Sequence, residues 1–370
     1  LTGSKVVTVE KDFDILKHVE AGDFVISMRS FQGGLEYSTK SGAISSAYVM
    51  LVPNLELVYP RFYRWLLKSS VYIDALQRTT NMVRDGQAMR YSNFAQVRLF
   101  TLPLDEQKSR ADFLDLECSS IDKILFKTRS SIEEYKKLKQ TVITQAVTKG
   151  VRGEREMKDS GVEWIGEIPK EFNPVQLKFF CKLITDGTHF SPTTVENGWP
   201  YITAGDVHGI GLDYNSAKRI SEEDFQLLVA QGCQPLKGDV LLVKDGATTG
   251  RVGFVDSDTP CVILSSVAML RPADNADGHY LMYLLASDFL QKQILVSMAG
   301  SAMPRTTLTK LTKYIGLLPP LHEQKEIANY LDAKCAEIDK LIAKKEQLVK
   351  ELESYKKSLI YEVVTGKREV

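Results

Sequence analysis

A long amphipathic pattern occurs twice in this 370-residue chain, and the duplication constrains the fold more than any other feature. The stretch LDEQKSRADFLDLECSSIDKILFK begins at Leu104, and LHEQKEIANYLDAKCAEIDKLIAK begins 217 residues later, at Leu321. The register persists without a gap to Val147-Thr148 in the first copy and Val364-Thr365 in the second. An ungapped match of this length indicates a true internal repeat, which must be recognised before the fold is interpreted.

Apolar residues recur at heptad spacing in both copies, and this predicts two long helices with a coiled-coil seam. Neither copy contains Pro or Gly, from 105 to 147 or from 322 to 364, so each predicts an unbroken helix about 65 Å long. The seam residues are Leu114, Cys118, Ile121, Leu125, Ile132, Tyr135, Val142 and Ala146 in the first copy, and Leu331, Cys335, Ile338, Ile342, Val349, Leu352, Leu359 and Val363 in the second.

Polar residues interrupt both seams at matching places, Thr128 with Lys345 and Lys139 with Lys356. Such positions usually specify register and partner choice. The chain leaves the first helix, forms a globular segment and returns along the second. We therefore predict antiparallel pairing about a pseudo-twofold axis. Pairing of each helix with a separate chain is the alternative.

The repeat extends more weakly into a globular segment ahead of each helix. Gly22-Asp23 resembles Gly238-Asp239, and GQAMRYSNF resembles GSAMPRTTL. The fold class is therefore α+β, with two α/β domains separated by the helix pair. The expected divisions are 1–103, 104–150 (first helix), 151–159 (charged linker), 160–319 and 320–366 (second helix). About 56 residues of the second domain lack a counterpart, so the first domain is expected to be incomplete at its N-terminal side.

The second globular segment contains five β-rich runs separated by turn signals such as Asp245-Gly246. A helix is expected around His279–Met298, capped by Asp277. The glycine-rich stretch GATTGRVG at Gly246–Gly253 lacks the Lys-Ser/Thr of a phosphate loop and precedes a strand, so it predicts a hairpin turn.

No recognisable catalytic motif is present, and the chain is not expected to be an enzyme. The five cysteines form no CxxC pair, and no histidine stands at metal-ligand spacing from a cysteine, so no metal site is expected. No apolar run is long enough to span a membrane. Reduced, buried thiols are typical of a cytoplasmic protein, which is the expected location.

Basic residues gather at matching places in the two domains although the net charge is zero. The stretch from Gln77 to Arg98 has four arginines and one acid, and Phe289–Gly316 has four cations and no acid. Local basic segments of this kind favour contacts with DNA phosphates. Ordinary solvated loop charges are the alternative.

Several motifs carry a resemblance to a known family. LPPLHEQKEIA at Leu318–Ala328 begins the second helix, VVTGK ends it, and DSGVEWIGEIP spans Asp159–Pro169. The chain strongly resembles the specificity subunit of type I restriction–modification systems. The resemblance implies two target-recognition domains, each reading one half of a bipartite double-stranded DNA site, and a coiled coil that sets their spacing.

The resemblance also implies partners: two methyltransferase subunits docked on the coil and two restriction/translocase subunits. S-adenosylmethionine would be held by the methyltransferase subunit, so no cofactor is expected in this chain. A coiled-coil scaffold that binds only proteins, or a partial silent copy of a specificity gene, are the alternatives. A methyltransferase gene beside this one would favour the specificity subunit over a scaffold.

Position within the repeat, the basic stretches, the glycine-rich hairpin and one polar turn supply the candidate DNA contacts. In the first domain they are Arg78, Arg84, Gln87, Arg90 and Tyr91, and in the second they are Thr188, His189, Lys244, Thr248, Thr249, Arg251, Ser301, Arg305 and Thr306. For His189, which lies in the polar turn DGTHFSP, a backbone-satisfying turn residue is the alternative.

Overall fold

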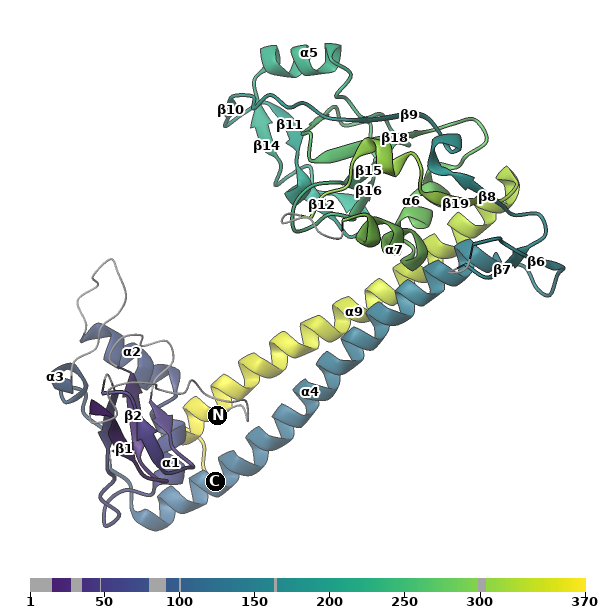
Figure 1. Cartoon of the computed structure of the whole chain (residues 1–370). Coiled ribbons are helices and arrows are strands. Elements are labelled where there is room, and N and C mark those ends of the chain that lie inside the picture. The colour runs from purple at the N-terminus through teal and green to yellow at the C-terminus, as the bar shows by residue number, and fades with distance from the viewer. Residues whose placement is uncertain are drawn as a thin grey trace. The chain divides into compact units, whose positions relative to one another are not determined.

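The computed structural model describes residues 15–27, 35–46, 48–79, 91–99, 101–162, 165–298 and 304–370 (Figure 1). The chain divides into two compact units. Unit 1 comprises Leu1–Ile132 and Lys344–Val370, and unit 2 comprises Glu133–Ala343. Each unit contains one globular domain and one end of the helix pair.

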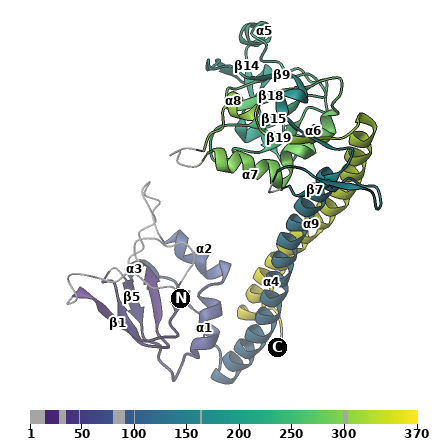
Figure 2. The same ribbon diagram turned by 45° about the vertical axis from the view of Figure 1, so that its right-hand side comes forward.

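The two repeated segments are long helices, α4 (Leu104–Lys149) and α9 (Leu321–Val364), which lie side by side in Figures 1 and 2. In unit 1, Leu114 near the start of α4 shares a core with Leu359 near the end of α9. In unit 2, Ala146 near the end of α4 shares a core with Leu331 near the start of α9. The predicted antiparallel coiled coil is confirmed.

Each lysine that interrupts the seam pairs with an aspartate of the facing helix. Lys139 Nζ lies 2.6 Å from Asp339 Oδ2 in unit 2, and Lys356 Nζ lies 2.6 Å from Asp122 Oδ1 in unit 1. The two lysines are repeat equivalents, and so are the two aspartates. Each interruption of the apolar seam therefore meets an acid on the facing helix, and the same pair forms twice. A shift of register would separate both pairs.

Besides its share of the coil, the described part of unit 1 has two small antiparallel sheets and three short helices. The sheet order is β3-β2-β5, with β1 paired to β4. The elements are β1 (Lys17–Val19), β2 (Phe24–Ser27), β3 (Glu36–Tyr37), β4 (Gly42–Ile44), β5 (Tyr48–Leu51), α1 (Pro60–Leu66), α2 (Ser70–Arg78) and α3 (Tyr91–Phe94).

The described residues of unit 2 form two four-stranded sheets and several smaller elements. Sheet order is β16-β15-β18-β9 in one and β10-β14-β11-β17 in the other, and β6-β7, β8-β19 and β12-β13 are pairs. The strands are β6 (Met157–Asp159), β7 (Glu167–Pro169), β8 (Asn173–Gln176), β9 (Cys181–Asp186), β10 (Thr194–Val195), β11 (Trp199–Ile202), β12 (Val207–His208), β13 (Gly211–Leu212), β14 (Lys218–Ile220), β15 (Val240–Val243), β16 (Val252–Phe254), β17 (Val262–Ile263), β18 (Val267–Pro272) and β19 (Ile315–Leu318).

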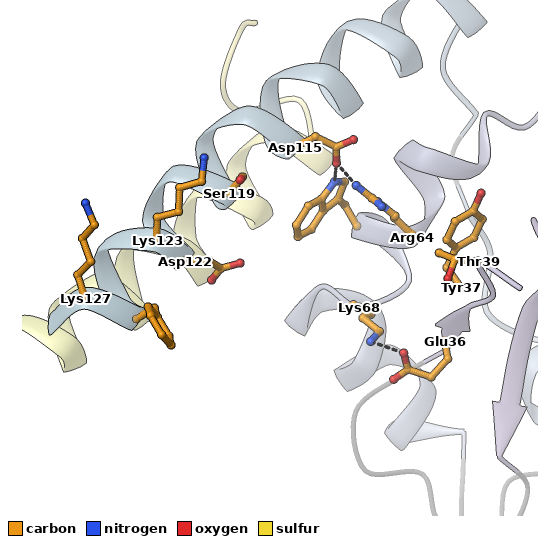
Figure 3. Close-up of a pocket in the computed structure, with 12 residues that line it drawn as sticks. Glu36, Tyr37, Thr39, Arg64, Lys68, Asp115, Ser119, Asp122, Lys123 and Lys127 are labelled. Atoms are coloured by element: carbon orange, nitrogen blue, oxygen red, sulfur yellow. Dashed lines mark hydrogen bonds and ion pairs between the residues drawn. The ribbon is translucent and has the colours of Figure 1, made fainter. Parts of the chain in front are cut away.

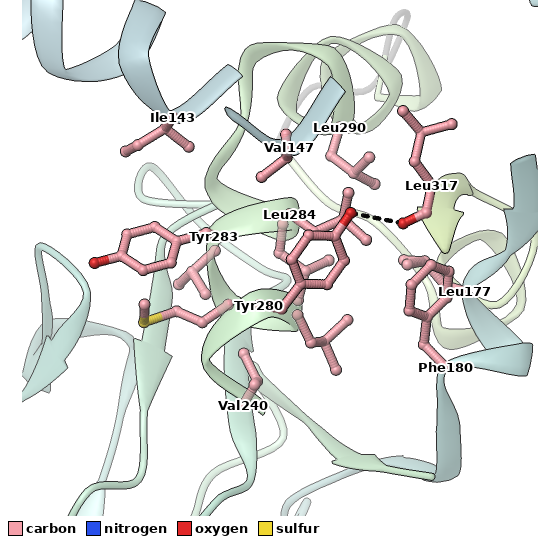
Figure 4. Close-up of a cluster of buried hydrophobic side chains, with 14 of the residues drawn as sticks. Ile143, Val147, Leu177, Phe180, Val240, Tyr280, Tyr283, Leu284, Leu290 and Leu317 are labelled. Carbon is pink, nitrogen blue, oxygen red and sulfur yellow. Dashed lines mark hydrogen bonds between the residues drawn. The ribbon is translucent and has the colours of Figure 1, made fainter. Parts of the chain in front are cut away.

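Helices α6 (Gly278–Ala286) and α7 (Asp288–Ser297) share one core with the main sheet of unit 2 and the coil. The other short helices in the described part of unit 2 are η2 (Leu177–Phe179), η3 (Ala204–Asp206), α5 (Glu222–Ala230) and α8 (Leu308–Leu311). Helix α6 is apolar around its circumference, and Tyr280, Tyr283 and Leu284 are fully buried among Ile143 and Val147 of α4 and strands of the sheet (Figure 4). Tyr280 retains a hydrogen bond from its hydroxyl to the Leu317 carbonyl at 2.7 Å.

The repeat is visible in the sheets as well. In unit 1 the central strand β2 pairs antiparallel with β3 and β5, and in unit 2 its counterpart β15 pairs antiparallel with β16 and β18. Strand β9 and the second sheet of unit 2 have no counterpart among the described residues of unit 1. The β15–β16 pairing also confirms that the glycine-rich stretch is a hairpin turn.

Two local expectations differ from the structure. The helix predicted around His279–Met298 is broken at Ser287, whose ψ of 148° is extended and which caps α7. Asp277 caps α6 as predicted and accepts from Tyr280 N at 3.0 Å. The segment 151–159 is more than a linker, because its end forms β6 and its Arg155 pairs with the buried Glu323 at 2.6 Å. Helical periodicity does not reveal a one-residue break, and the partner of Arg155 is remote in sequence.

A buried glutamine at the start of each long helix holds it to its own globular domain. Gln324 donates to the Asn275 and Pro319 carbonyls, both at 2.9 Å, and accepts from the Asp277 amide at 2.8 Å. Its repeat equivalent, Gln107, makes the same three bonds: Nε2 donates to the Leu57 and Leu102 carbonyls, and Oε1 accepts from the Tyr59 amide. Both side chains are fully buried, so this hydrogen bonding explains why the EQK motif recurs.

A second duplicated anchor lies two turns further along each helix. Asp115 accepts from Arg61, Arg64 and Trp65 of α1. Asp332 accepts from Tyr283 of α6 at 2.8 Å and lies 3.2 Å from His279 Nδ1. In both copies two of the contacting residues stand at positions i and i+4 of one domain helix, Arg61 and Trp65 in α1 and His279 and Tyr283 in α6, and so share one face of that helix.

We expect Gln324→Leu to lower the free energy of unfolding by about 3 kcal/mol, because three buried backbone groups would lose their partner. Urea unfolding followed by circular dichroism measures the change. Gln347→Leu, an exposed glutamine on the same helix, is the matched control and should change stability by less than about 0.5 kcal/mol. Equal effects of the two changes would contradict a specific role for Gln324.

The Asp115 anchor predicts a pH dependence. Burial opposes ionisation, but the hydrogen bonds from Arg61, Arg64 and Trp65 outweigh it and lower the pKa of Asp115. Because the folded-state pKa is depressed, its stabilisation is present above the unfolded pKa of about 4 and is lost as pH falls through the folded pKa. We expect the stability difference between wild type and Asp115→Asn to be largest near neutral pH and to shrink below about pH 4.

Urea unfolding over a pH series tests this dependence. Asp74→Asn, at an exposed position of α2, is the control. A difference between wild type and Asp115→Asn that stayed constant down to about pH 2 would count against the anchor, since both carboxyl states would then be equivalent.

Candidate nucleic-acid interface

One edge of the main sheet of unit 2 collects the ends of its strands. Both β9 and β15 pair antiparallel with β18, so they run in the same direction and end at the same edge. Asp186 ends β9 there, and Lys244 follows the last residue of β15. The turn to β16 and the start of β18 lie at this edge too.

A third segment joins this edge. Asp245 and Arg305 form an antiparallel bridge, the Gly246 amide donates to the Pro304 carbonyl at 3.0 Å, and the Thr306 amide donates to the Lys244 carbonyl at 2.9 Å. The structure therefore brings together eight predicted residues that are far apart in sequence: Thr188, His189, Lys244, Thr248, Thr249, Arg251, Arg305 and Thr306.

Four charged side chains at the edge alternate in sign, and an imidazole stands next to the last of them. Arg305 Nε lies 2.9 Å from Asp245 Oδ1, and Lys244 Nζ lies 2.8 Å from Asp245 Oδ2 and 3.3 Å from Asp186 Oδ2. His189 Nε2 stands 3.9 Å from the same Asp186 oxygen. Lys244 is the centre of this series with a side chain only 3% exposed, whereas Arg305 and His189 are 59% and 74% exposed. We call Asp186, His189, Lys244, Asp245 and Arg305 together the edge network.

Each network aspartate is followed by a glycine for a backbone reason. A Cβ at Gly187 would lie 1.9 Å from the Ile263 carbonyl oxygen, so that position admits no side chain. Gly246 has a φ of +96°, in the region that favours glycine. The two Asp-Gly steps thus place acids where strands end and turn sharply.

Burial bears on several predicted contacts. Lys244 is enclosed by two carboxylates, and Thr306 is fully buried with its hydroxyl 2.6 Å from the Tyr314 hydroxyl. Thr188 is buried and accepts from the Phe190 amide, and Thr249 donates to the Gly246 carbonyl. These four side chains bond to the protein's own polar groups, and their contact with DNA stays a prediction.

Three predicted residues of unit 2, His189, Arg251 and Arg305, are exposed, and Thr248 is half-buried. In unit 1, Arg78 is exposed at the end of α2, and Tyr91 is exposed at the start of α3 with its ring centroid 6.0 Å from that of Phe94. Arg84, Gln87, Arg90 and Ser301 lie outside the described residues.

Sequence reasoning missed Asp186 and Asp245. In the sequence both are parts of Asp-Gly turn signals, and an Asp-Gly pair is a common turn that by itself indicates no further role. The excess of basic residues in the sequence favours the cations as candidates, whereas in the structure Asp186 and Asp245 pair with those cations.

A cavity of about 780 Å³ in unit 1 lies apart from the predicted contacts (Figure 3). It is formed by α1, β3 and the adjacent face of α4, with Arg64 and Asp115 joined at one side and Lys68 paired with Glu36 at 2.6 Å at the other. Lys123, Phe126 and Lys127 of α4 complete the lining. Its charges are mixed and largely paired, so it has no marked preference for an anion.

The cysteines are held as thiols by burial. Burial raises the pKa of Cys118 to about 11 and that of Cys181 and Cys261 to about 12. In the described part of the chain, no cluster of three or more His, Cys, Asp or Glu side chains is placed to hold a metal ion. None of the described helices combines the length and apolarity that crossing a lipid bilayer requires.

The fold and this edge define a class: a protein that carries two related recognition domains on an internally duplicated antiparallel coiled coil. Residues 169–352 match the family described as "Type I restriction modification DNA specificity domain". The chain belongs to the specificity subunits of type I restriction–modification systems, whose role is DNA sequence recognition. Specificity subunits are non-catalytic, and catalysis lies in partner subunits.

Similar proteins agree with this assignment. The Type I restriction enzyme MjaVIII specificity subunit of Methanocaldococcus jannaschii is 26% identical over 362 residues, covering 94% of this chain and 80% of that protein. The putative MjaX specificity subunit of the same organism is 23% identical, covering 96% and 78%.

Two solved structures share the fold. A chain solved in work on the complex assembly and conformational transition of the type I R-M system has a TM-score of 0.71 at 17% identity, covering 94% of this chain and 83% of that one. The HsdS subunit from Thermoanaerobacter tengcongensis has a TM-score of 0.50 at 18% identity, covering 95% and 82%.

The burial of Lys244 leads to a stability prediction. Lys244→Met would leave Asp186 and Asp245 facing each other without their shared cation, and we expect the free energy of unfolding to fall by about 3 kcal/mol. Lys237→Met, at a lysine that is 58% exposed, should cost less than about 0.5 kcal/mol. Urea unfolding of both variants makes the comparison. Unchanged stability in Lys244→Met would favour a DNA contact over a structural role for Lys244.

Proposed function

We propose that the edge network and its surroundings in unit 2 read one half of a bipartite double-stranded DNA site, and that the domain of unit 1 reads the other half. The convergence of His189, Arg251 and Arg305 on a single sheet edge carries this proposal. Two exposed arginines and an exposed imidazole, together with the half-buried hydroxyl of Thr248, suit a surface that meets both phosphates and base edges.

The coiled coil is proposed to set the spacing between half-sites and to dock two methyltransferase subunits. Its duplicated anchors support this role, because equivalent helix faces would present equivalent surfaces to two copies of one partner. Two restriction/translocase subunits would complete the assembly. S-adenosylmethionine would bind in the methyltransferase subunit, and the complex would act in the cytoplasm. The domain limits predicted from sequence are retained as part of the proposal.

A map of methylated adenines tests the function in cells. Cells carrying this gene and its methyltransferase partner are compared with cells lacking only this gene. We expect a split motif that disappears with the gene. An unchanged map, with the protein expressed and bound to its partner, would favour a protein scaffold or an inactive partial copy.

Arg251 offers a sharper test of the interface in unit 2. Arg251→Ala removes an exposed cation from the network edge, so DNA binding by the purified complex should weaken. If Arg251 contacts a phosphate, the slope of the logarithm of the binding constant against the logarithm of the salt concentration should become shallower by about one unit. Lys237, which precedes β15 and hence lies at the opposite edge of the sheet, supplies the control Lys237→Ala. Equal losses in both variants would contradict the choice of edge.

A further inference from the structure

Asp245 stands between a buried cation and an exposed one. One carboxylate oxygen meets Lys244 and the other meets Arg305. Because Lys244 also meets Asp186 and is almost fully buried, the position of Asp245 is determined by the protein interior. The bridge between Asp245 and Arg305 ties their backbones as well. Arg305 is therefore an exposed side chain whose carboxylate partner is held in place by the protein interior.

We propose that Asp245 is a positioning residue that holds Arg305 to read a guanine in the half-site contacted by unit 2. This rests on the proposed function. The contact with Asp245 is through Nε, and we find no hydrogen bond from Nη1 or Nη2 to any other described residue. The two terminal nitrogens match the O6 and N7 acceptors that guanine presents in the major groove.

The charge balance favours a base over a phosphate. The Asp245 carboxylate offsets the charge of Arg305 at 2.9 Å, which weakens the attraction of Arg305 for an anionic phosphate. It leaves the N–H donors unchanged, and a neutral base edge recognises donors rather than net charge. A phosphate contact would also gain little from a fixed side-chain orientation, since it is not sequence-specific.

The Asp245 contact is an ion pair that leaves room for adjustment. Oδ1 of Asp245 is buried and accepts no aligned hydrogen bond within the described structure, although Nε of Arg305 is only 2.9 Å away. A small rotation of the guanidinium on binding would align this bond. The hydrogen bond from Arg305 Nε to Asp245 Oδ1 would then form as the guanidinium binds guanine.

The test uses the complete chain with its methyltransferase partner and the map of methylated adenines as readout. We expect Asp245→Asn and Arg305→Lys each to lower the preference for G·C at the same single position of one half-site by about tenfold. Each variant loses a guanidinium held in place by Asp245, but keeps a positive charge at position 305. The other half-site should be unchanged. Asp258→Asn, an exposed aspartate of unit 2, is the matched control and should keep the wild-type motif.

The double variant separates positioning from a general structural effect. If Asp245 acts through Arg305, then Asp245→Asn combined with Arg305→Ala should relax the motif no more than Arg305→Ala alone. Relaxation at different base pairs, a uniform loss of methylation at all sites, or an unchanged motif in Asp245→Asn would each overturn the proposal. If wild type itself produces no gene-dependent motif, the proposed function fails first, and this inference falls with it.

Discussion

The buried glutamine at the start of each long helix is the interaction on which the architecture depends. Gln107 and Gln324 each satisfy two carbonyls and one amide of the loop that precedes or faces the helix. Since these backbone groups are buried, their geometry leaves little freedom in how a helix leaves its own domain. The aspartate anchors at Asp115 and Asp332 repeat the constraint further along. Each recognition domain is thereby joined to its end of the coil by polar contacts of defined direction.

The edge network in unit 2 follows the same principle at a smaller scale. A buried charge is tolerated only when it is paired, and Lys244 is paired twice. The pairing fixes two carboxylates at the ends of neighbouring strands, and each carboxylate faces an exposed donor. Surface residues that read DNA need such support, because a flexible arginine cannot discriminate among bases through geometry.

Much of the architecture was predictable because it is written in local periodicity and in a repeat. The heptad seam, the absence of Pro and Gly, and the 217-residue offset predict two helices and their antiparallel pairing. The Asp277 cap and the hairpin at Gly246–Gly253 were likewise evident from short-range signals. The break at Ser287 was not, because apolar residues continue through it at helical spacing and only backbone geometry marks the division.

The sequence by itself determined the coiled coil, the duplication and the kinds of residue in the proposed interface. Only the tertiary structure decided which of those residues face outward. From the sequence, Lys244 and Arg305 are both expected to be exposed cations. In the structure Lys244 is enclosed, whereas Arg305 is exposed and can meet a ligand. The difference arises from Asp186, brought to the same edge by a strand about sixty residues away, and long-range pairing of this kind leaves no local pattern in a single sequence.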